Sequence, residues 1–213
     1  MKNKFILPLF LFFSFLFSSI SSQTLHPGVE RWQVKTSLAE HPKKQTVSLN
    51  KLLSLPNPIN SSRETPENGR IDKKEEGLKE GDLVTVTGYI HLIALENDSK
   101  KHRDGDYHIQ IRTSSKWGDT CLIVEIPLPD FIVDTVLKKK CTIARNFILT
   151  KILNSKQPST KGRIMTDEEY VTITGQLFFD ASHLKGKPRG KQGMHSYTCW
   201  EIHPVTNIKF AKH

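Results

Sequence analysis

The pattern of apolar and polar residues changes near residue 80. Beyond that point, apolar positions recur with the two-residue period of β-strands. Gly88 falls where a strongly bent strand favours a residue without a side chain, and Pro204 requires an edge position or a bulge. We therefore predict five strands, in residues 82–95, 106–112, 120–126, 171–179 and 200–210.

One helical segment interrupts the strands. Residues 131–153 have helical spacing, which is strongest from Asp134 to Leu149. The order strand, strand, strand, helix, strand, strand is that of an OB-fold, a small five-stranded Greek-key barrel. We predict a mainly β protein in which residues 81–213 form an OB-fold-like barrel with one helix between strands 3 and 4. Another small barrel or a sandwich is the alternative, and one helix is too few for a doubly wound sheet.

Residues 23–80 have a different composition and lack this regular pattern. Five prolines interrupt them, and residues 57–70 are typical of a loop because proline and small polar residues prevent regular pairing. Two apolar patches, residues 29–34 and 47–55, break this pattern. We predict an irregular N-terminal segment that packs on the barrel or links to it, with free-standing disorder as the alternative.

The first 22 or so residues have the three parts of a secretory signal peptide. Lys2 and Lys4 precede the almost wholly apolar residues 5–17, and a serine-rich stretch follows at 18–22. A membrane-spanning helix needs about 20 apolar residues, and this run is shorter. We predict that residues 1–22 are removed, that the protein is periplasmic or extracellular, and that the mature chain has no membrane span.

Three cysteines remain after this cleavage. In an oxidising compartment, one disulfide and one free thiol is the simplest arrangement. Cys121 and Cys199 have the same parity near the starts of two strands that neighbour each other in an OB barrel, and strand spacing suits a disulfide. We predict a Cys121–Cys199 bond; Cys121–Cys141 and three unpaired thiols are the alternatives. No CxxC pair supports a zinc knuckle or a thioredoxin-type site.

The net charge of +9 suggests anionic partners. Basic residues cluster at 138–140 and 185–191, where they can bind phosphates or acidic polysaccharides or simply form a solvated surface. OB-folds bind oligonucleotides and oligosaccharides, and Tyr89, Trp117 and Tyr197 are candidates for stacking. Our first prediction is an exported binding module for a polyanion such as nucleic acid or an anionic polysaccharide.

Strand alternation also assigns polar residues to one face of the barrel. The second, third and last strands are neighbours in an OB-fold, so their outward residues should share one exposed surface. The end of the fourth strand should lie at its rim. The candidate ligand-binding residues are Asp106, His108, Glu125, Glu201 and His203 on the surface, with Asp180 and His183 at the rim.

Imidazoles and carboxylates together can hold a divalent metal or exchange protons with a substrate. The predicted metal ligands are His108, Glu125, Glu201 and His203. With a metal-bound water as nucleophile, and Arg145 or Arg112 to neutralise phosphate charge, the alternative function is phosphodiester hydrolysis. No HExxH or HxH motif supports it, and strands in water point polar residues outward without any chemistry.

Six blocks of the sequence resemble one family. They are VERWQVKT at 29–36, DGDYH at 104–108, IVEIP at 123–127, AR at 144–145, GQLFFD at 175–180 and WEIHPV at 200–205. The chain is similar, over most of its mature length, to an uncharacterised family of exported bacterial proteins with these blocks in this order. The resemblance implies a bacterial source and an OB-like barrel, and it brings no activity. Gln33 stands where the first block of that family is expected to have proline.

Overall fold

The computed structural model describes residues 30–96, 104–115, 118, 120–166 and 169–212. The expected signal peptide and Trp117 lie outside this part of the chain, so the structure leaves both predictions open. Among the described residues, no helix has the length and apolar character needed to cross a membrane.

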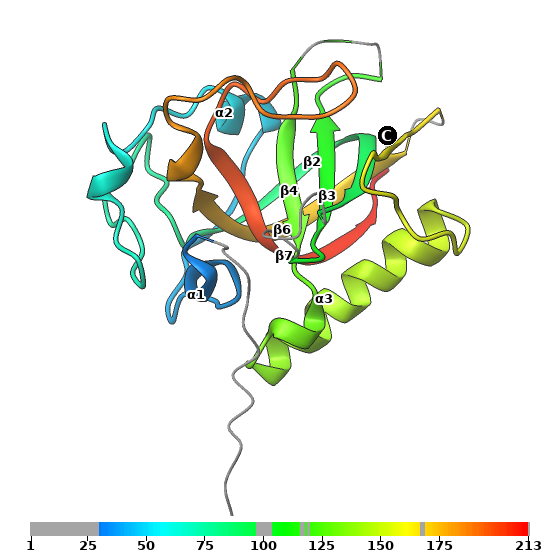
Figure 1. The fold of residues 1–213 in the computed structure, drawn as a ribbon, viewed down its shortest axis with the longest axis horizontal. Coiled ribbons are helices and arrows are strands. Elements are labelled where there is room, and N and C mark those ends of the chain that lie inside the picture. The colour runs from blue at the N-terminus through cyan, green and yellow to red at the C-terminus, as the bar shows by residue number, and fades with distance from the viewer. Residues whose placement is uncertain (1–29, 97–103, 116–117, 119, 167–168, 213) are drawn as a thin grey trace, which may run out of the picture.

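Five long strands close into a barrel. They are β2 (Leu83–Leu95), β3 (Tyr107–Arg112), β4 (Leu122–Ile126), β6 (Tyr170–Phe179) and β7 (Trp200–Phe210). The strand order is β2-β3-β4-β7-β6, and β6 pairs back with β2. Only the β4–β7 pair is parallel within this ring; the others are antiparallel (Figure 1). The predicted OB-fold-like barrel is therefore confirmed.

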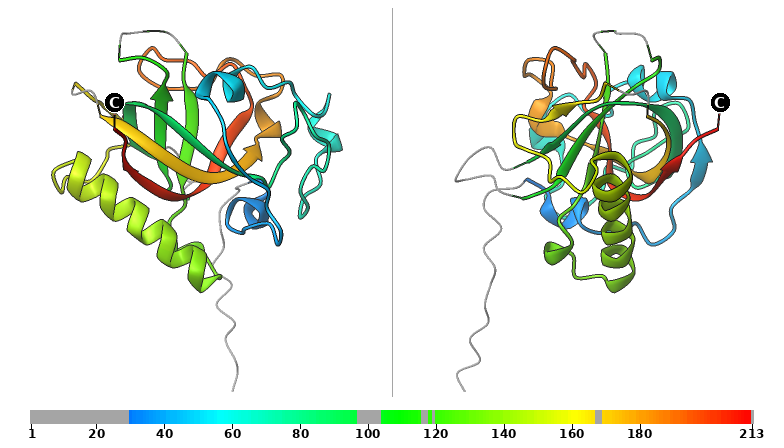
Figure 2. Two further views of the ribbon diagram at one scale, coloured as in Figure 1. Left: turned by 180° about the vertical axis from the view of Figure 1, so that it is seen from behind. Right: turned by 90° about the vertical axis from the view of Figure 1, so that its right-hand side faces the viewer.

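The shorter elements lie before and between these strands. They are α1 (Trp32–Lys35), β1 (Lys44–Thr46), α2 (Leu49–Leu53), η1 (Ser62–Glu64), η2 (Pro129–Phe131), α3 (Thr135–Phe147), η3 (Ile148–Ile152), β5 (Arg163–Ile164) and η4 (Ala181–His183). The Asp134 side chain caps α3 by accepting a hydrogen bond from the Leu137 backbone N–H at 2.6 Å. This helix lies across one end of the barrel, between the third and fourth barrel strands as predicted (Figures 1 and 2).

The N-terminal segment shares the hydrophobic core of the barrel. Leu49, Leu52 and Leu55 are buried in the same cluster as the inward residues of the strands. Strand β1 pairs with β2 in parallel, and the Trp200 indole N–H donates to the Pro56 carbonyl at 2.8 Å. The segment therefore packs on the barrel instead of hanging free, because its apolar patches are part of the core.

A buried ion pair attaches this segment to the barrel. Both terminal nitrogens of Arg31 lie 2.7 Å from the Glu80 carboxylate oxygens, and both side chains are almost completely buried. Arg31 also donates to the Phe179 carbonyl, and Glu80 accepts from the Phe179 backbone N–H. One guanidinium group thus connects the start of the described chain to β6.

The loop between β6 and β7, residues 180–199, covers the outer face of the barrel away from α3 (Figure 2). The Gln110 side chain donates to the Lys191 carbonyl at 3.2 Å and accepts from its backbone N–H. Arg189 of the loop pairs with Glu201 of β7. All six residues of β3 are buried, on both faces of the strand, and the loop contributes to this at Gln110.

The predicted Cys121–Cys199 disulfide is wrong. Cys121, Cys141 and Cys199 are all free and buried thiols. Ile123 pairs with Glu201, whereas Thr120 pairs with His195. Between these two pairings the β4 segment advances by three residues (123 − 120), and the β7 segment advances by six (201 − 195). The register breaks just before β7, and strand parity therefore does not bring the two sulfurs together.

Candidate functional site

A pocket of about 530 Å³ opens on the outer face of β3, β4 and β7. Its walls come from the β2–β3 loop, the β6–β7 loop and α1. Polar and charged residues dominate the lining: Lys35, Glu96, Asp104, His108, Glu125, Asp180, His183, Lys187, Arg189, Lys191 and Glu201. In an OB-fold, this face and the two corresponding loops form the usual ligand site.

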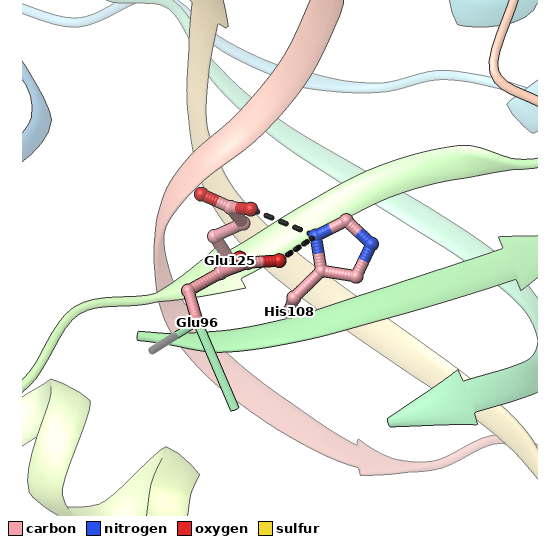
Figure 3. A group of neighbouring side chains, drawn as sticks. All are labelled: Glu96, His108 and Glu125. Carbon is pink, nitrogen blue, oxygen red and sulfur yellow. Dashed lines mark hydrogen bonds and ion pairs between the residues drawn. The ribbon is translucent and has the colours of Figure 1, made fainter. Parts of the chain in front are cut away.

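Two carboxylates converge on one nitrogen of His108. Glu125 Oε1 lies 2.9 Å and Glu96 Oε1 lies 3.2 Å from His108 Nδ1 (Figure 3). The other ring nitrogen, Nε2, is 3.3 Å from the Gln110 side-chain oxygen. His108 comes from β3 and Glu125 from the directly paired position of β4, so the barrel register itself makes this contact.

His203 of β7 lies beside the same glutamate from the other side. Its Nδ1 is 3.1 Å from Glu125 Oε2 and 3.9 Å from Glu201 Oε2, and its Nε2 is 3.4 Å from Asp106 Oδ2. The ring is completely buried, yet within the described chain neither nitrogen makes a hydrogen bond of acceptable geometry. Asp106 Oδ2 and Glu201 Oε2 are likewise buried without a hydrogen-bond donor.

The protonation of these groups follows from their mutual contacts. Burial disfavours the imidazolium form of His203, but the Glu125 and Glu201 carboxylates outweigh it and raise its pKa to about 9. Burial, followed by the negative charge of Asp104, raises the pKa of Asp106 to about 7. For Glu125, burial is opposed by both histidines, which hold its pKa well below the ordinary value.

The predicted residues are brought together, but their predicted exposure is wrong. Asp106 and His203 are completely buried, and His108, Glu125 and Glu201 are 5 %, 8 % and 2 % exposed. Alternation correctly separated them from the inward apolar residues. It could not show that the β6–β7 loop and α1 cover the outer face and leave only a pocket.

Asp180 and His183 line the pocket at its rim. Asp180 follows β6, caps η4, and lies 2.8 Å from His183 Nδ1 and 3.1 Å from Arg189. Burial opposes ionisation of Asp180, but His183, Lys35 and Arg189 outweigh it and lower its pKa. Because Arg189 also pairs with Glu201, it connects Asp180 at the rim of the pocket to Glu201 at its floor.

Arg145 does not face this pocket, so its expected role in neutralising phosphate is wrong. It donates to the Gly105 and Ile126 carbonyls at 3.0 and 2.9 Å, and its guanidinium lies over the Tyr107 ring at 3.6 Å. These contacts attach α3 to the barrel. Arg112, at the other end of β3, does not line the pocket either.

The aromatic candidates for stacking also lie elsewhere. Tyr89 packs against Tyr170, with ring centroids 4.7 Å apart. Tyr197 is exposed on the β6–β7 loop, where its ring is 6.1 Å from that of His195. Neither lines the pocket, and stacking on a described aromatic residue therefore finds no support at this site.

Sequence reasoning missed Glu96 and Lys35 as pocket residues. Glu96 directly follows β2, and nothing in its pattern distinguishes it from an ordinary residue at a strand end. Lys35 belongs to a short helix far away in the sequence, and its ammonium lies 5.3 Å above the Phe178 ring. Burial disfavours its charge, but Asp180 and Glu125 outweigh this and raise its pKa. Arg189 and Lys191 belong to the basic run, which was the only signal for them.

The floor of the pocket has the donors and the spacing of a divalent-metal site. A six-coordinate ion with bonds of about 2.1 Å has neighbouring ligand atoms about 3.0 Å apart. The distances from Glu125 to His108 and to His203, 2.9 and 3.1 Å, fall at this value, which is also that of an ordinary hydrogen bond. Two donor groups, Glu96–His108–Glu125 and Asp106–Glu125–His203, have ligand atoms within 4.8 Å of one another. Imidazole with carboxylate, and without thiolate, suits Zn²⁺ or Mn²⁺.

Known proteins offer no direct guide to this site. The chain was compared with protein-family models, with curated proteins and with solved structures, and no match was found in any of the three.

Proposed function

We propose that this protein is an exported, divalent-metal-dependent hydrolase of phosphodiesters. The observation that carries the proposal is the completely buried His203 ring, which has three carboxylates within 3.9 Å and no hydrogen bond of acceptable geometry in the described chain. Imidazole and carboxylate are ligands that Zn²⁺ or Mn²⁺ takes in proteins. A metal ion bound at Nδ1 would satisfy that nitrogen and the adjacent carboxylate oxygens together.

The surroundings of the pocket support an anionic substrate. Lys35 and Lys187 line it above the acidic floor, and the pocket lies on the face with which OB-folds bind oligonucleotides. A volume of about 530 Å³ is within the usual range for a site that takes a small molecule, here one phosphodiester with its neighbouring groups. A single-stranded nucleic acid fits this description best.

The reaction needs only water as co-reactant. A bound ion lowers the pKa of its water so that hydroxide is available near neutral pH. Its oxygen attacks phosphorus, a new P–O bond forms, and the P–O bond to the leaving alcohol breaks. The water loses one proton to solvent through the open pocket, and the leaving oxygen takes one up, so one water is consumed for each ester cleaved.

Export is part of the same proposal. It is supported by Lys2 and Lys4, the apolar residues 5–17 and the serine-rich exit that follows them. A hydrolase outside the cytoplasm would encounter extracellular nucleic acid and not the genome of its own cell.

A binding module without catalysis is the second candidate. The basic residues that line the pocket and its position on the ligand face of the barrel favour it, because both suit a polyanion whether or not a bond is cleaved. The two candidates differ in whether a metal is required.

The test is hydrolysis of bis(p-nitrophenyl) phosphate and of single-stranded DNA by the full protein after dialysis against EDTA. We expect no activity until Mn²⁺ or Zn²⁺ is added, and a loss of more than about 100-fold in His203→Gln. His195→Gln is the control, since His195 is exposed outside the pocket, and it should retain activity. If neither metal produces hydrolysis while single-stranded DNA binds equally well with EDTA, the protein is a binding module and the hydrolase proposal is wrong.

A further inference from the structure

The Glu125 carboxylate divides its two oxygens between two histidines. Oε1 is 2.9 Å from His108 Nδ1, and Oε2 is 3.1 Å from His203 Nδ1. The histidines come from β3 and β7, which flank β4 on its two sides. A carboxylate placed in this way can bind one ion through each oxygen.

The His108 imidazole is oriented as metal-binding histidines usually are. Its Nδ1 faces Glu125, while its Nε2 lies 3.3 Å from the Gln110 side-chain oxygen. In metal sites, such a partner fixes the tautomer and leaves the other nitrogen available to the ion. Both nitrogens of His203 face carboxylates instead, Nδ1 that of Glu125 and Nε2 that of Asp106.

A third donor completes each half. Glu96 Oε1 is 3.2 Å from His108 Nδ1. In the other half the third donor is Asp106, which with Glu125 and His203 places ligand atoms within 4.8 Å of one another. Asp106 Oδ2 is buried and accepts no hydrogen bond in the part of the chain described. A fully buried imidazole and a buried carboxylate oxygen, neither with a hydrogen bond of acceptable geometry, thus lie in the same small region.

We infer that the pocket floor binds two divalent ions bridged by Glu125, an inference that rests on the proposed hydrolase function. One ion takes His108, Glu96 and Glu125; the other takes His203, Asp106 and Glu125, and in each set the ligand atoms lie within 4.8 Å of one another. Carboxylate-bridged ions lie about 3.5–4 Å apart in two-metal phosphoesterases, where they stabilise the attacking and the leaving oxygen together.

Basic side chains already lie against this floor. Lys191 Nζ is 3.3 Å from Glu96 Oε1, and Arg189 pairs with Glu201. An ion bound at Glu96 therefore competes with the ammonium group of Lys191. The His108 half opens to the pocket through Glu96, whereas His203 is completely buried, so the ion at His108 is the one that substrate meets first.

The test is the metal content of the EDTA-treated full protein after loading with Mn²⁺ and desalting. We expect two Mn²⁺ ions per chain by inductively coupled plasma mass spectrometry, and the spectrum of an exchange-coupled Mn²⁺ pair by electron paramagnetic resonance. Glu96→Gln and Asp106→Asn should each retain one ion and give the uncoupled spectrum, while Glu125→Gln should weaken the binding of both ions at least 10-fold. Glu40→Gln, an exposed carboxylate outside the pocket, should retain two coupled ions.

The outcomes separate this inference from the function on which it rests. One ion per chain together with metal-dependent hydrolysis overturns the bridged pair and leaves the hydrolase intact. Two uncoupled ions, or a Glu125→Gln protein that loses only one, also overturn it. No ion and no hydrolysis defeat both proposals. The metal content and the spectrum of the wild-type protein test the inference even if a variant fails to fold. Circular dichroism identifies any such variant.

Discussion

At the scale of single residues, the pocket depends on groups whose charge is set by burial. Glu125 stays ionised because two histidines offset its desolvation, and Arg189 serves both Asp180 and Glu201. For the thiols, burial outweighs the nearby guanidinium groups, which are Arg189 for Cys121 and Cys199 and Arg145 for Cys141. Burial therefore raises the pKa of Cys121 and of Cys141 to about 12 and also raises that of Cys199.

The thiols should accordingly be unreactive in the native protein. Because the folded pKa exceeds the unfolded value of about 8.5, burial of these neutral thiols stabilises the fold fully below about pH 8.5. That contribution is lost as the pH rises towards 12. We expect iodoacetamide at pH 8 to modify none of them natively and all three in guanidinium without reductant, by intact mass. Modification of only one cysteine in denaturant would instead demonstrate a disulfide.

At the scale of elements, β6 and β7 lie against each other at Gly175 without room for a side chain. The register between the two strands shifts at this point, opposite Val205, which places Pro204 beside the irregularity that proline requires. A Cβ at Gly175 would collide with the Ile202 side chain, and it would lie 2.7 Å from the Pro204 carbonyl oxygen. No side chain fits here without moving one strand of the barrel.

Gly175→Ala should therefore destabilise the protein by about 3 kcal/mol, because the clash is with backbone as well as side chain. Gly118→Ala is the matched control, since a Cβ there meets no atom within 4 Å. That change should alter the free energy of unfolding by less than about 0.5 kcal/mol. Urea denaturation followed by circular dichroism measures both values, and equal effects would mean that the two strands are not packed this closely.

At the scale of the whole molecule, the irregular segment and the barrel form one unit. Residues before the barrel contribute Leu49, Leu52 and Leu55 to its core, and they contribute Lys35 to its pocket. The Arg31–Glu80 pair holds this segment in place by hydrogen bonds that reach β6. The site is therefore completed by a part of the chain that lies outside the barrel sequence.

Replacing one partner of this ion pair should destabilise the protein more than replacing both partners. Arg31→Met leaves the buried Glu80 carboxylate uncompensated, and we expect a loss of about 3–5 kcal/mol in the free energy of unfolding. The double variant Arg31→Met, Glu80→Leu removes both charges and should recover most of that loss. Urea titrations of the two proteins give the comparison. A double variant as unstable as the single one would show that the hydrogen bonds to backbone, and not the unpaired charge, dominate.

The sequence by itself determined the strands, the helix and their order along the chain. These depend on local periodicity, which a strand such as residues 107–112 displays whatever surrounds it. Alternation also separated His108, Glu125 and His203 from the apolar core, because successive side chains point to opposite faces.

Only the tertiary structure decided that these residues are buried, that Glu96 and Lys35 join them, and that the three cysteines remain apart. Each of these depends on how a loop or a distant segment lies against the barrel. Residues 180–199 carry no periodic pattern that could indicate which face they cover, and a break in register such as that before β7 leaves no local signal. The physical reason is that contacts between segments far apart in the chain are set by packing and charge pairing, which the spacing of residues within one segment does not encode.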